Sequence, residues 1–387
     1  MGKRLSDTGR ARGFRPGQRR AAVHASALTW AASPWACERN SRLNRVTIRD
    51  VAELARVSPA SVSNYFHKPR KLSDATRQRI QQAVDALGFV PNDAARTLRT
   101  GVSPVIGYIA FELAGATTPE IAAAIERRVS AEGMYMLMAN DTGSEQRERS
   151  YLQLFAKQLV SGVIIAPVGN VEAELARMRS FGIASVLSAR HAESPEQASV
   201  SIDHVAGGKL AAAHLVELGR KRIGFVSSSL ALKQVADRLN GALSAVHSAP
   251  GVTLEVIPVP ERSVEAGIAC ADAIARRPPS ERPDALFCAN DLLAIGVVQA
   301  FVSSKVVSVP SDIAVVGYDD IEFARSTIVP LTTIRTPHAE LGTAAADLLF
   351  AEIDALGSAG ERGTPHLPRP QIEFSPELVV RASTVRQ

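Results

Sequence analysis

From Val105 onward, short apolar segments alternate with stretches of helical periodicity, and this alternation constrains the fold more than any other feature. Near-continuous apolar strands between helices are typical of parallel sheets that helices cover on both faces. A body of roughly 280 residues is large for one such sheet, so we predict an α/β fold with two similar lobes. The predicted strands are 105–111, 134–140, 162–167, 183–188, 222–228, 254–259, 284–290 and 313–319, and the predicted helices include 119–132, 145–160, 205–219, 233–247, 264–277, 291–303 and 338–356.

The composition narrows the class of protein. The chain has 387 residues, of which 46% are hydrophobic and 21% charged, the balance of a globular protein with a sizeable core. No run of roughly 18 or more apolar residues occurs, so neither a transmembrane helix nor a membrane partner is expected. Its three cysteines, Cys37, Cys270 and Cys288, are widely spaced and form no disulfide framework or metal knuckle. We therefore expect a reducing compartment and a cytoplasmic, nucleoid-associated protein.

The net charge of +5 is unevenly distributed. Residues 1–44 contain nine Lys or Arg and two acids, and residues 45–100 contain ten and five, so the remainder is acidic. A basic N-terminal quarter suggests a polyanionic partner. For residues 1–44 alone, a solvated disordered extension explains the positive charge equally well. In the same segment, Arg19-Arg20 before an alanine-rich stretch faintly resembles a twin-arginine export signal.

Residues 46–66 predict two short helices. Thr47 is suited to cap the first, with an acid three residues later. Ser58 is suited to cap the second, and Pro59 at its first position loses no hydrogen bond. A third helix is expected from Ser73 to a stop at Gly88. This pattern predicts a helix-turn-helix domain, or else ordinary packed helices, around a core of Val51, Val57, Val62, Ile80 and Val84.

Three features favour a DNA-binding helix-turn-helix. The outward positions of the second helix are small or hydrogen-bonding, as a DNA groove requires: Pro59, Ala60, Ser61 and Asn64. The helix N-termini at Thr47 and Ser58 offer backbone N–H groups to phosphates. Basic residues that could neutralise phosphates surround these helices, namely Arg49, Arg56, Lys68, Arg70, Lys71, Arg77 and Arg79.

These residues resemble the DNA-binding headpiece of the lactose/galactose repressor (LacI/GalR) family of bacterial transcriptional regulators. The resemblance lies in T-I-x-D-V-A-x-x-A-x-V-S (47–58), S-V-S (61–63) and G-F-x-P-N-x-x-A-x-x-L (88–98). It continues less specifically to about residue 383, where it implies a two-lobed, periplasmic-binding-protein-like core.

For the headpiece, the resemblance implies that Pro59, Ala60 and Asn64 face base edges in the major groove. The family usually has Arg where this chain has Asn64, and Gly where it has Arg56. The first departure implies an unusual operator sequence. The second places at the tight turn a residue that adopts the required backbone conformation less readily than glycine.

The resemblance also implies a hinge helix after the headpiece, with Asn92 and Ala95 among its matching residues and Leu98 as a wedge in the minor groove. So short a helix is marginal alone in water, so we expect it to order on DNA opposite a twin.

For the core, the resemblance implies a small-molecule effector between the lobes, outside the carboxyl ends of the strands. A sugar or sugar derivative is the default for the family, and the polar side chains also suit an acidic metabolite. Asp291 and Asp320 can equally be helix caps, and Asp203 can orient a lobe. The expected effector-binding residues are Phe111, Thr117, Arg238, Asn290, Asp319 and His338.

The sequence thus predicts a dimeric repressor on a pseudo-palindromic operator, controlled by its effector. The alternative, an exported solute-binding protein with an Arg-rich signal, leaves residues 46–100 unexplained. No nucleotide-binding, hydrolase or metal motif occurs, so neither catalysis nor a further cofactor is expected. The expected domains are a disordered extension (1–44), the helix-turn-helix domain (45–91), the hinge (92–101), lobe 1 (102–202 and 334–357) and lobe 2 (203–333 and 370–387).

Overall fold

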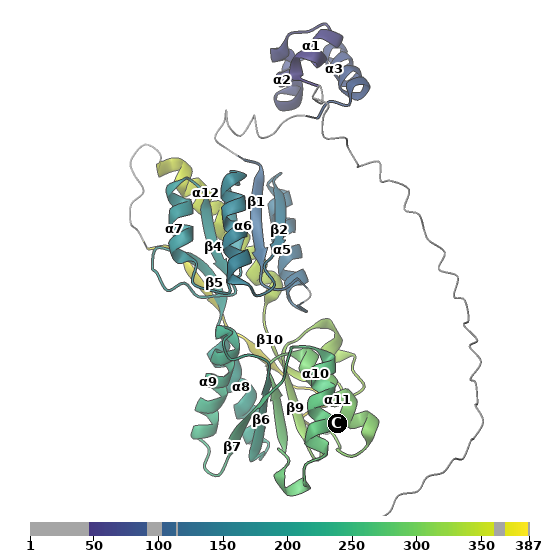
Figure 1. The fold of residues 1–387 in the computed structure, drawn as a ribbon, viewed down its shortest axis with the longest axis vertical. Helices are drawn as coiled ribbons and strands as arrows, with labels where there is room; N and C mark the ends of the chain where they lie inside the picture. Colours follow the sequence, from purple (N-terminus) through teal and green to yellow (C-terminus); the bar gives the residue numbers. More distant parts are fainter. Residues whose placement is uncertain (1–45, 91–102, 114, 360–367, 386–387) are drawn as a thin grey trace, which may run out of the picture. The chain divides into compact units, whose positions relative to one another are not determined.

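The computed structural model describes residues 46–90, 103–113, 115–359 and 368–385, which form two units divided at residues 91–92 (Figure 1). We call residues 46–90 the headpiece and the described residues from 103 onward the core. The expected extension at 1–44 and the hinge residues Asn92, Ala95 and Leu98 lie outside the described residues.

The headpiece contains three α-helices and a short 3-10 helix, and its helix boundaries follow the capping signals. Thr47, Ser58 and Ser73 are the N-caps, and Gly88, in the left-handed conformation at φ 60°, ends the third helix. The elements are α1 (Ile48–Leu54), α2 (Pro59–His67), η1 (Pro69–Lys71) and α3 (Asp74–Leu87).

The headpiece helices enclose a small apolar core. Val51, Val62 and Ile80 are fully buried, as expected, while Val57 and Val84 are half-buried at its edge. Between α1 and α2 the chain turns at Arg56, whose φ of 51° is in the left-handed region. The turn therefore needs the conformation that favours glycine, although the side chain there is arginine.

The first lobe of the core is a six-stranded parallel sheet with the strand order β11-β5-β4-β3-β1-β2. Helices α5 and α12 pack against one face and α6 and α7 against the other, as the two separate clusters of buried apolar residues show (Figure 1). The elements are β1 (Val105–Ala110), α5 (Thr118–Ala131), β2 (Tyr135–Asn140), α6 (Glu145–Lys157), β3 (Gly162–Ile165), α7 (Glu172–Ser180), β4 (Ala184–Ser188), β5 (Ala198–Ile202), α12 (His338–Ala359) and β11 (Gln371–Phe374).

The second lobe repeats this architecture with the order β12-β10-β9-β8-β6-β7, in which only β12 is antiparallel to its neighbour. Helices α8 and α9 cover one face, and α10 and α11 the other. The elements are α8 (His204–Glu217), β6 (Arg222–Ser227), α9 (Lys233–His247), β7 (Thr253–Pro258), α10 (Val264–Ala275), η2 (Pro279–Glu281), β8 (Ala285–Cys288), α11 (Asp291–Ser304), β9 (Ala314–Asp319), η3 (Glu322–Arg325), β10 (Thr332–Arg335) and β12 (Glu377–Val379).

The chain crosses between the two lobes three times: from β5 to α8, from β10 to α12 and from β11 to β12. The expectation that all of 370–387 belongs to lobe 2 was wrong for β11, which pairs in parallel with β5 of the first sheet. Likewise Ile334 and Arg335 belong to β10 in the second sheet rather than to lobe 1. The strand β11 forms an edge of the first sheet, whereas β10 lies between β12 and β9 in the second.

No helix within the described ranges is both long and apolar enough to cross a lipid bilayer.

Candidate functional site

The outer face of α2 carries the residues expected to meet DNA. Pro59 and Ala60 are exposed, and Ser61 and Asn64 are half-buried. The Ser58 hydroxyl oxygen accepts a hydrogen bond from the Ser61 N–H (3.1 Å) and lies 3.0 Å from the Ser61 hydroxyl. Because Pro59 has no N–H, the Ala60 N–H remains at this helix end for an external acceptor such as a phosphate oxygen.

Thr47 has a different role at the start of α1. Its backbone N–H and its hydroxyl both donate to the Asp50 carboxylate, at 2.7 and 2.9 Å. These two hydrogen bonds hold the pKa of Asp50 below its ordinary value. Thr47 is therefore a capping residue whose donors Asp50 already occupies.

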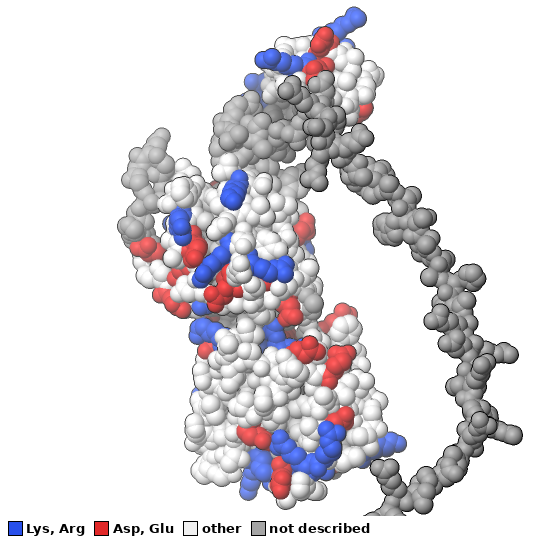
Figure 2. All heavy atoms as spheres, in the orientation of Figure 1, with Lys and Arg blue, Asp and Glu red and all other residues white. Residues whose placement is uncertain are grey.

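The headpiece exposes the basic side chains that a polyanion would need, as Figure 2 shows for the face in view. One of the expected residues, Arg77, is half-buried and pairs with Asp74. The others are exposed: Arg49, Arg56, Lys68, Arg70, Lys71 and Arg79.

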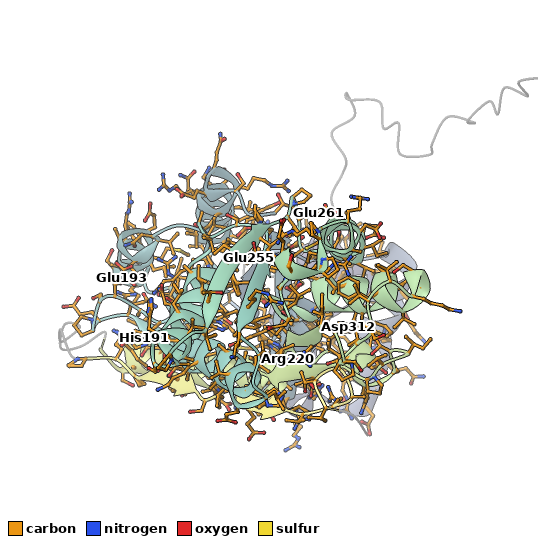
Figure 3. The ribbon with its side chains drawn as sticks, turned by 90° about the horizontal axis from the view of Figure 1, so that it is seen from below. His191, Glu193, Arg220, Glu255, Glu261 and Asp312 are labelled. Atoms are coloured by element: carbon orange, nitrogen blue, oxygen red, sulfur yellow. The ribbon has the colours of Figure 1, made fainter. Side chains whose placement is uncertain are left out.

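The core has a cavity of about 610 Å³ that is lined from both lobes. The first lobe contributes Phe111 after β1 and Ser188 at the end of β4, with the loop that follows. His191 and Glu193, in this loop, lie along the same edge of the core in Figure 3. The second lobe contributes the first turns of α8 and α9 through Asp203, His204, Val205, Leu232, Lys233, Gln234 and Asp237.

Several charges that line this cavity already have partners. Nη2 of Arg190 lies 3.6 Å from Oε1 of Glu193, and Nζ of Lys233 lies 3.1 Å from Oδ2 of Asp237. Asp203 accepts the Ala206 N–H (2.8 Å) as the cap of α8. By contrast, the buried hydroxyl of Ser188 has no hydrogen-bond partner among the described residues. Such a cavity suits a neutral hydroxylated molecule better than an ion.

A network centred on Arg238 lies at the crossings. Its Nη1 donates to the Ala289 carbonyl, and its Nη2 lies 3.4 Å from Oδ1 of Asp319. Its Cζ is 3.6 Å from the centroid of the Tyr318 ring. A carboxylate and an aromatic face together compensate the buried guanidinium for its lost hydration.

Two histidines extend this network. The His204 Nδ1 lies 3.0 Å from the Tyr318 hydroxyl, and burial together with the charge of Arg238 holds its pKa well below the ordinary value. The His338 Nε2 shares a 2.6 Å hydrogen bond with the Thr336 hydroxyl. Burial lowers the His338 pKa despite nearby acids, so both rings are neutral at pH 7.

The structure brings together only part of the predicted effector set. Asp319 and His338 line a second cavity of about 350 Å³, and Arg238 contacts Asp319, whereas Phe111 lines the larger cavity. Thr117 lines neither of these cavities. Asn290 lines neither of them either, and its side chain accepts the Leu293 N–H (3.1 Å) as the cap of α11.

Asp291 and Asp320, which the sequence allowed to be helix caps, both have other partners in the structure. Asp291 is not a cap: it is fully buried and accepts the Thr333 hydroxyl (2.6 Å) and the Ile321 N–H (2.9 Å). Burial raises its pKa well above the ordinary value. Asp320 pairs with Arg335 and Arg381, at 2.8 and 2.7 Å.

Ser188 and His204 were not anticipated. Ser188 ends a predicted strand, so the rule that ligands lie at the carboxyl ends of strands could have identified it. His204 follows β5, whose sequence A-S-V-S-I alternates small polar and apolar residues and was not recognised as a strand.

Known protein families match both the headpiece and the core. The model of "Bacterial regulatory proteins, lacI family" matches residues 47–92, and that of "Periplasmic binding protein-like domain" matches residues 212–384. The chain is 31% identical to the HTH-type transcriptional repressor PurR of Mannheimia succiniciproducens over 340 residues, covering 87% of this chain and 98% of that protein.

Solved structures give the same result. The lac repressor dimer bound to operator and the anti-inducer ONPF is similar with a TM-score of 0.72 and 26% identity, covering 88% of this chain and 99% of that one. The transcriptional regulator CelR in complex with cellobiose is similar with a TM-score of 0.60 and 26% identity, covering 88% and 100%. The helix-turn-helix headpiece, the two-sheet core and these matches together show that the chain belongs to the LacI family of DNA-binding transcriptional regulators.

Proposed function

We propose that this protein is a repressor that binds a pseudo-palindromic operator as a homodimer in the cytoplasm, and that a small molecule in the interlobe cleft controls its affinity for DNA. The observation that carries the proposal is the 610 Å³ cavity lined from both lobes in a chain that also has a DNA-binding headpiece. A ligand that contacts both lobes favours one arrangement of them over another, which is the physical requirement for allosteric control.

The proposed effector is a neutral, hydroxylated metabolite such as a sugar or sugar derivative. The unpartnered Ser188 hydroxyl can accept and donate hydrogen bonds inside the cavity, while Phe111 offers an apolar face. Arg238, Asp319 and His338 would contact a ligand that reaches the crossings. The similarity to a regulator solved with cellobiose supports this ligand class.

On the DNA side, we propose that Asn64 reads a base in the major groove and that Pro59 and Ala60 touch thymine methyl groups. An Asn side chain can pair bidentately with adenine, and small apolar groups fit against the methyl. Exposed Arg and Lys side chains of the headpiece would neutralise phosphates. The hinge residues Asn92, Ala95 and Leu98 are proposed to enter the minor groove between the two half-sites.

The test begins with selection of the preferred duplex from random DNA by the purified full-length chain. Its affinity is then measured by fluorescence anisotropy with and without each of a panel of mono- and disaccharides. We expect at least one sugar to change the operator affinity of the wild type, and Ser188→Ala to reduce that response. Ser180→Ala, at an exposed position on α7 outside the cavity, is the matched control and should respond normally. Equal responses of the two variants would remove Ser188 from the effector site.

A further inference from the structure

An ion pair joins the two lobes directly, apart from the three crossings of the chain. Glu112 follows β1 in the first lobe, and Arg262 precedes α10 in the second. Oε2 of Glu112 and Nη2 of Arg262 are 2.5 Å apart although 150 residues separate them in sequence. This contact therefore depends on how the lobes are arranged.

The same arginine also reaches the wall of the cavity. The Cζ of Arg262 lies 5.2 Å from the ring centroid of Phe111, which lines the interlobe cavity. Arg262 thus contacts two consecutive residues that follow β1, one through an ion pair and one through a cation–π contact. Figure 3 shows Glu261, the residue before it, beside the start of α10. That carboxylate accepts the Ser263 hydroxyl (2.8 Å).

The pair is exposed enough to open without unfolding either lobe. The Glu112 side chain is 45% exposed and that of Arg262 is 21% exposed, so water and salt compete with the contact. His338 and Asp319 also meet between the lobes, with Nε2 4.0 Å from Oδ1, but burial keeps the His338 imidazole neutral. The Glu112–Arg262 pair is thus an interlobe attraction between two full charges.

We propose that Glu112 and Arg262 form an interlobe clasp that holds the lobes in the arrangement seen here and sets how readily they separate. Because Arg262 also packs over Phe111, the clasp connects the cavity wall to the lobe arrangement. Removal of either charge should leave both sheets folded and shift the population toward separated lobes.

The experiment measures the distance between the lobes in the full chain without ligand. Spin labels are placed at the exposed positions Gln153→Cys on α6 and Ser280→Cys in η2, with Cys37→Ser, while the buried Cys270 and Cys288 remain. Double electron–electron resonance then gives the distance distribution. For Glu112→Gln or Arg262→Gln, the ratio of longer-distance to shorter-distance populations should rise about two- to fivefold, the range for one partly exposed ion pair.

Two matched controls separate the clasp from a general loss of charge. Glu261→Gln removes the neighbouring acid, and Arg128→Gln breaks ion pairs within the first lobe, where Arg128 also packs over an aromatic ring. Both should keep the wild-type distribution. The exchange of Glu112→Arg with Arg262→Glu should restore it. An unchanged distribution in both neutralised variants, equal shifts in the controls, or no restoration by the exchange would overturn the clasp.

Discussion

The guanidinium of Arg238 lies over the ring of Tyr318, with 3.6 Å between Cζ and the ring centroid, and its Nη2 lies 3.4 Å from Oδ1 of Asp319. Arg238→Ala would leave the Asp319 carboxylate without this cation and the Tyr318 ring without its partner. We expect the free energy of unfolding of the core to fall by about 3 kcal/mol, as for other broken buried pairs. Urea unfolding followed by circular dichroism measures it, and a loss below about 0.5 kcal/mol would show that the pair is not electrostatically coupled.

Arg56 holds the turn between α1 and α2 at a φ of 51°. Arg56→Gly should stabilise the headpiece by about 1 kcal/mol, because glycine adopts the left-handed conformation without a steric penalty. Hydrogen exchange of peptides covering residues 46–66 measures the change. Arg49→Gly, within α1, is the control and should destabilise by a similar amount. Faster exchange in Arg56→Gly would show that the left-handed conformation at this turn does not destabilise the headpiece.

Asn64 is predicted to read one base of each half-site. Asn64→Ala should lose about 1–3 kcal/mol of discrimination at a single position, since one bidentate contact is removed. Binding to a set of duplexes that vary each position in turn provides the measurement. A uniform weakening across all sequences would assign Asn64 to phosphate contact instead.

Asp141 should make the stability of the core depend on pH. It lies directly after β2, fully buried, with Oδ1 accepting the Gly143 N–H (2.8 Å) and Oδ2 lacking a partner in the described structure. Burial raises its pKa from 3.8 to about 6. Because the folded state binds the proton more tightly, its contribution to stability is full below pH 3.8 and is lost as the pH rises through about 6.

Asp141→Asn should remove this dependence, which amounts to at most about 3 kcal/mol. The variant should gain stability relative to the wild type between pH 4.5 and 7, as measured by urea unfolding at both values. A constant difference between the two proteins across this range would mean that Asp141 does not titrate there. Part of the wild-type dependence should persist in the variant, because burial also raises the pKa of Glu148.

The sequence predicted those elements that have strong local signals. Capping residues located the headpiece helices, and all eight apolar segments became strands. Six of them are buried inside the sheets, while β2 and β7 are largely exposed edge strands. The strands β5, β10, β11 and β12 were missed. They are three to five residues long, and their mixed polar sequences become strands through pairing with neighbours that are distant in the chain.

The candidate site was predictable only in part for the same reason. Arg238 and Asp319 lie on elements that the periodicity identified, and their place in one site was expected from the family resemblance. The contact between Glu112 and Arg262 depends on the relative position of two lobes, which no local pattern encodes. Likewise, the role of Asn290 as a cap rather than a cavity residue depends on its rotamer and its backbone geometry.

The headpiece is proposed to bind duplex DNA through the α2 face in a sequence-dependent manner. Fluorescence anisotropy of the full chain measures this binding on the selected duplex and on a scrambled duplex, at salt concentrations from about 50 to 200 mM. We expect the selected duplex to bind at least about a thousandfold more tightly than the scrambled one, and the affinity for both to fall steeply with salt. Equal affinity for the two duplexes, or binding that does not change with salt, would contradict the proposal.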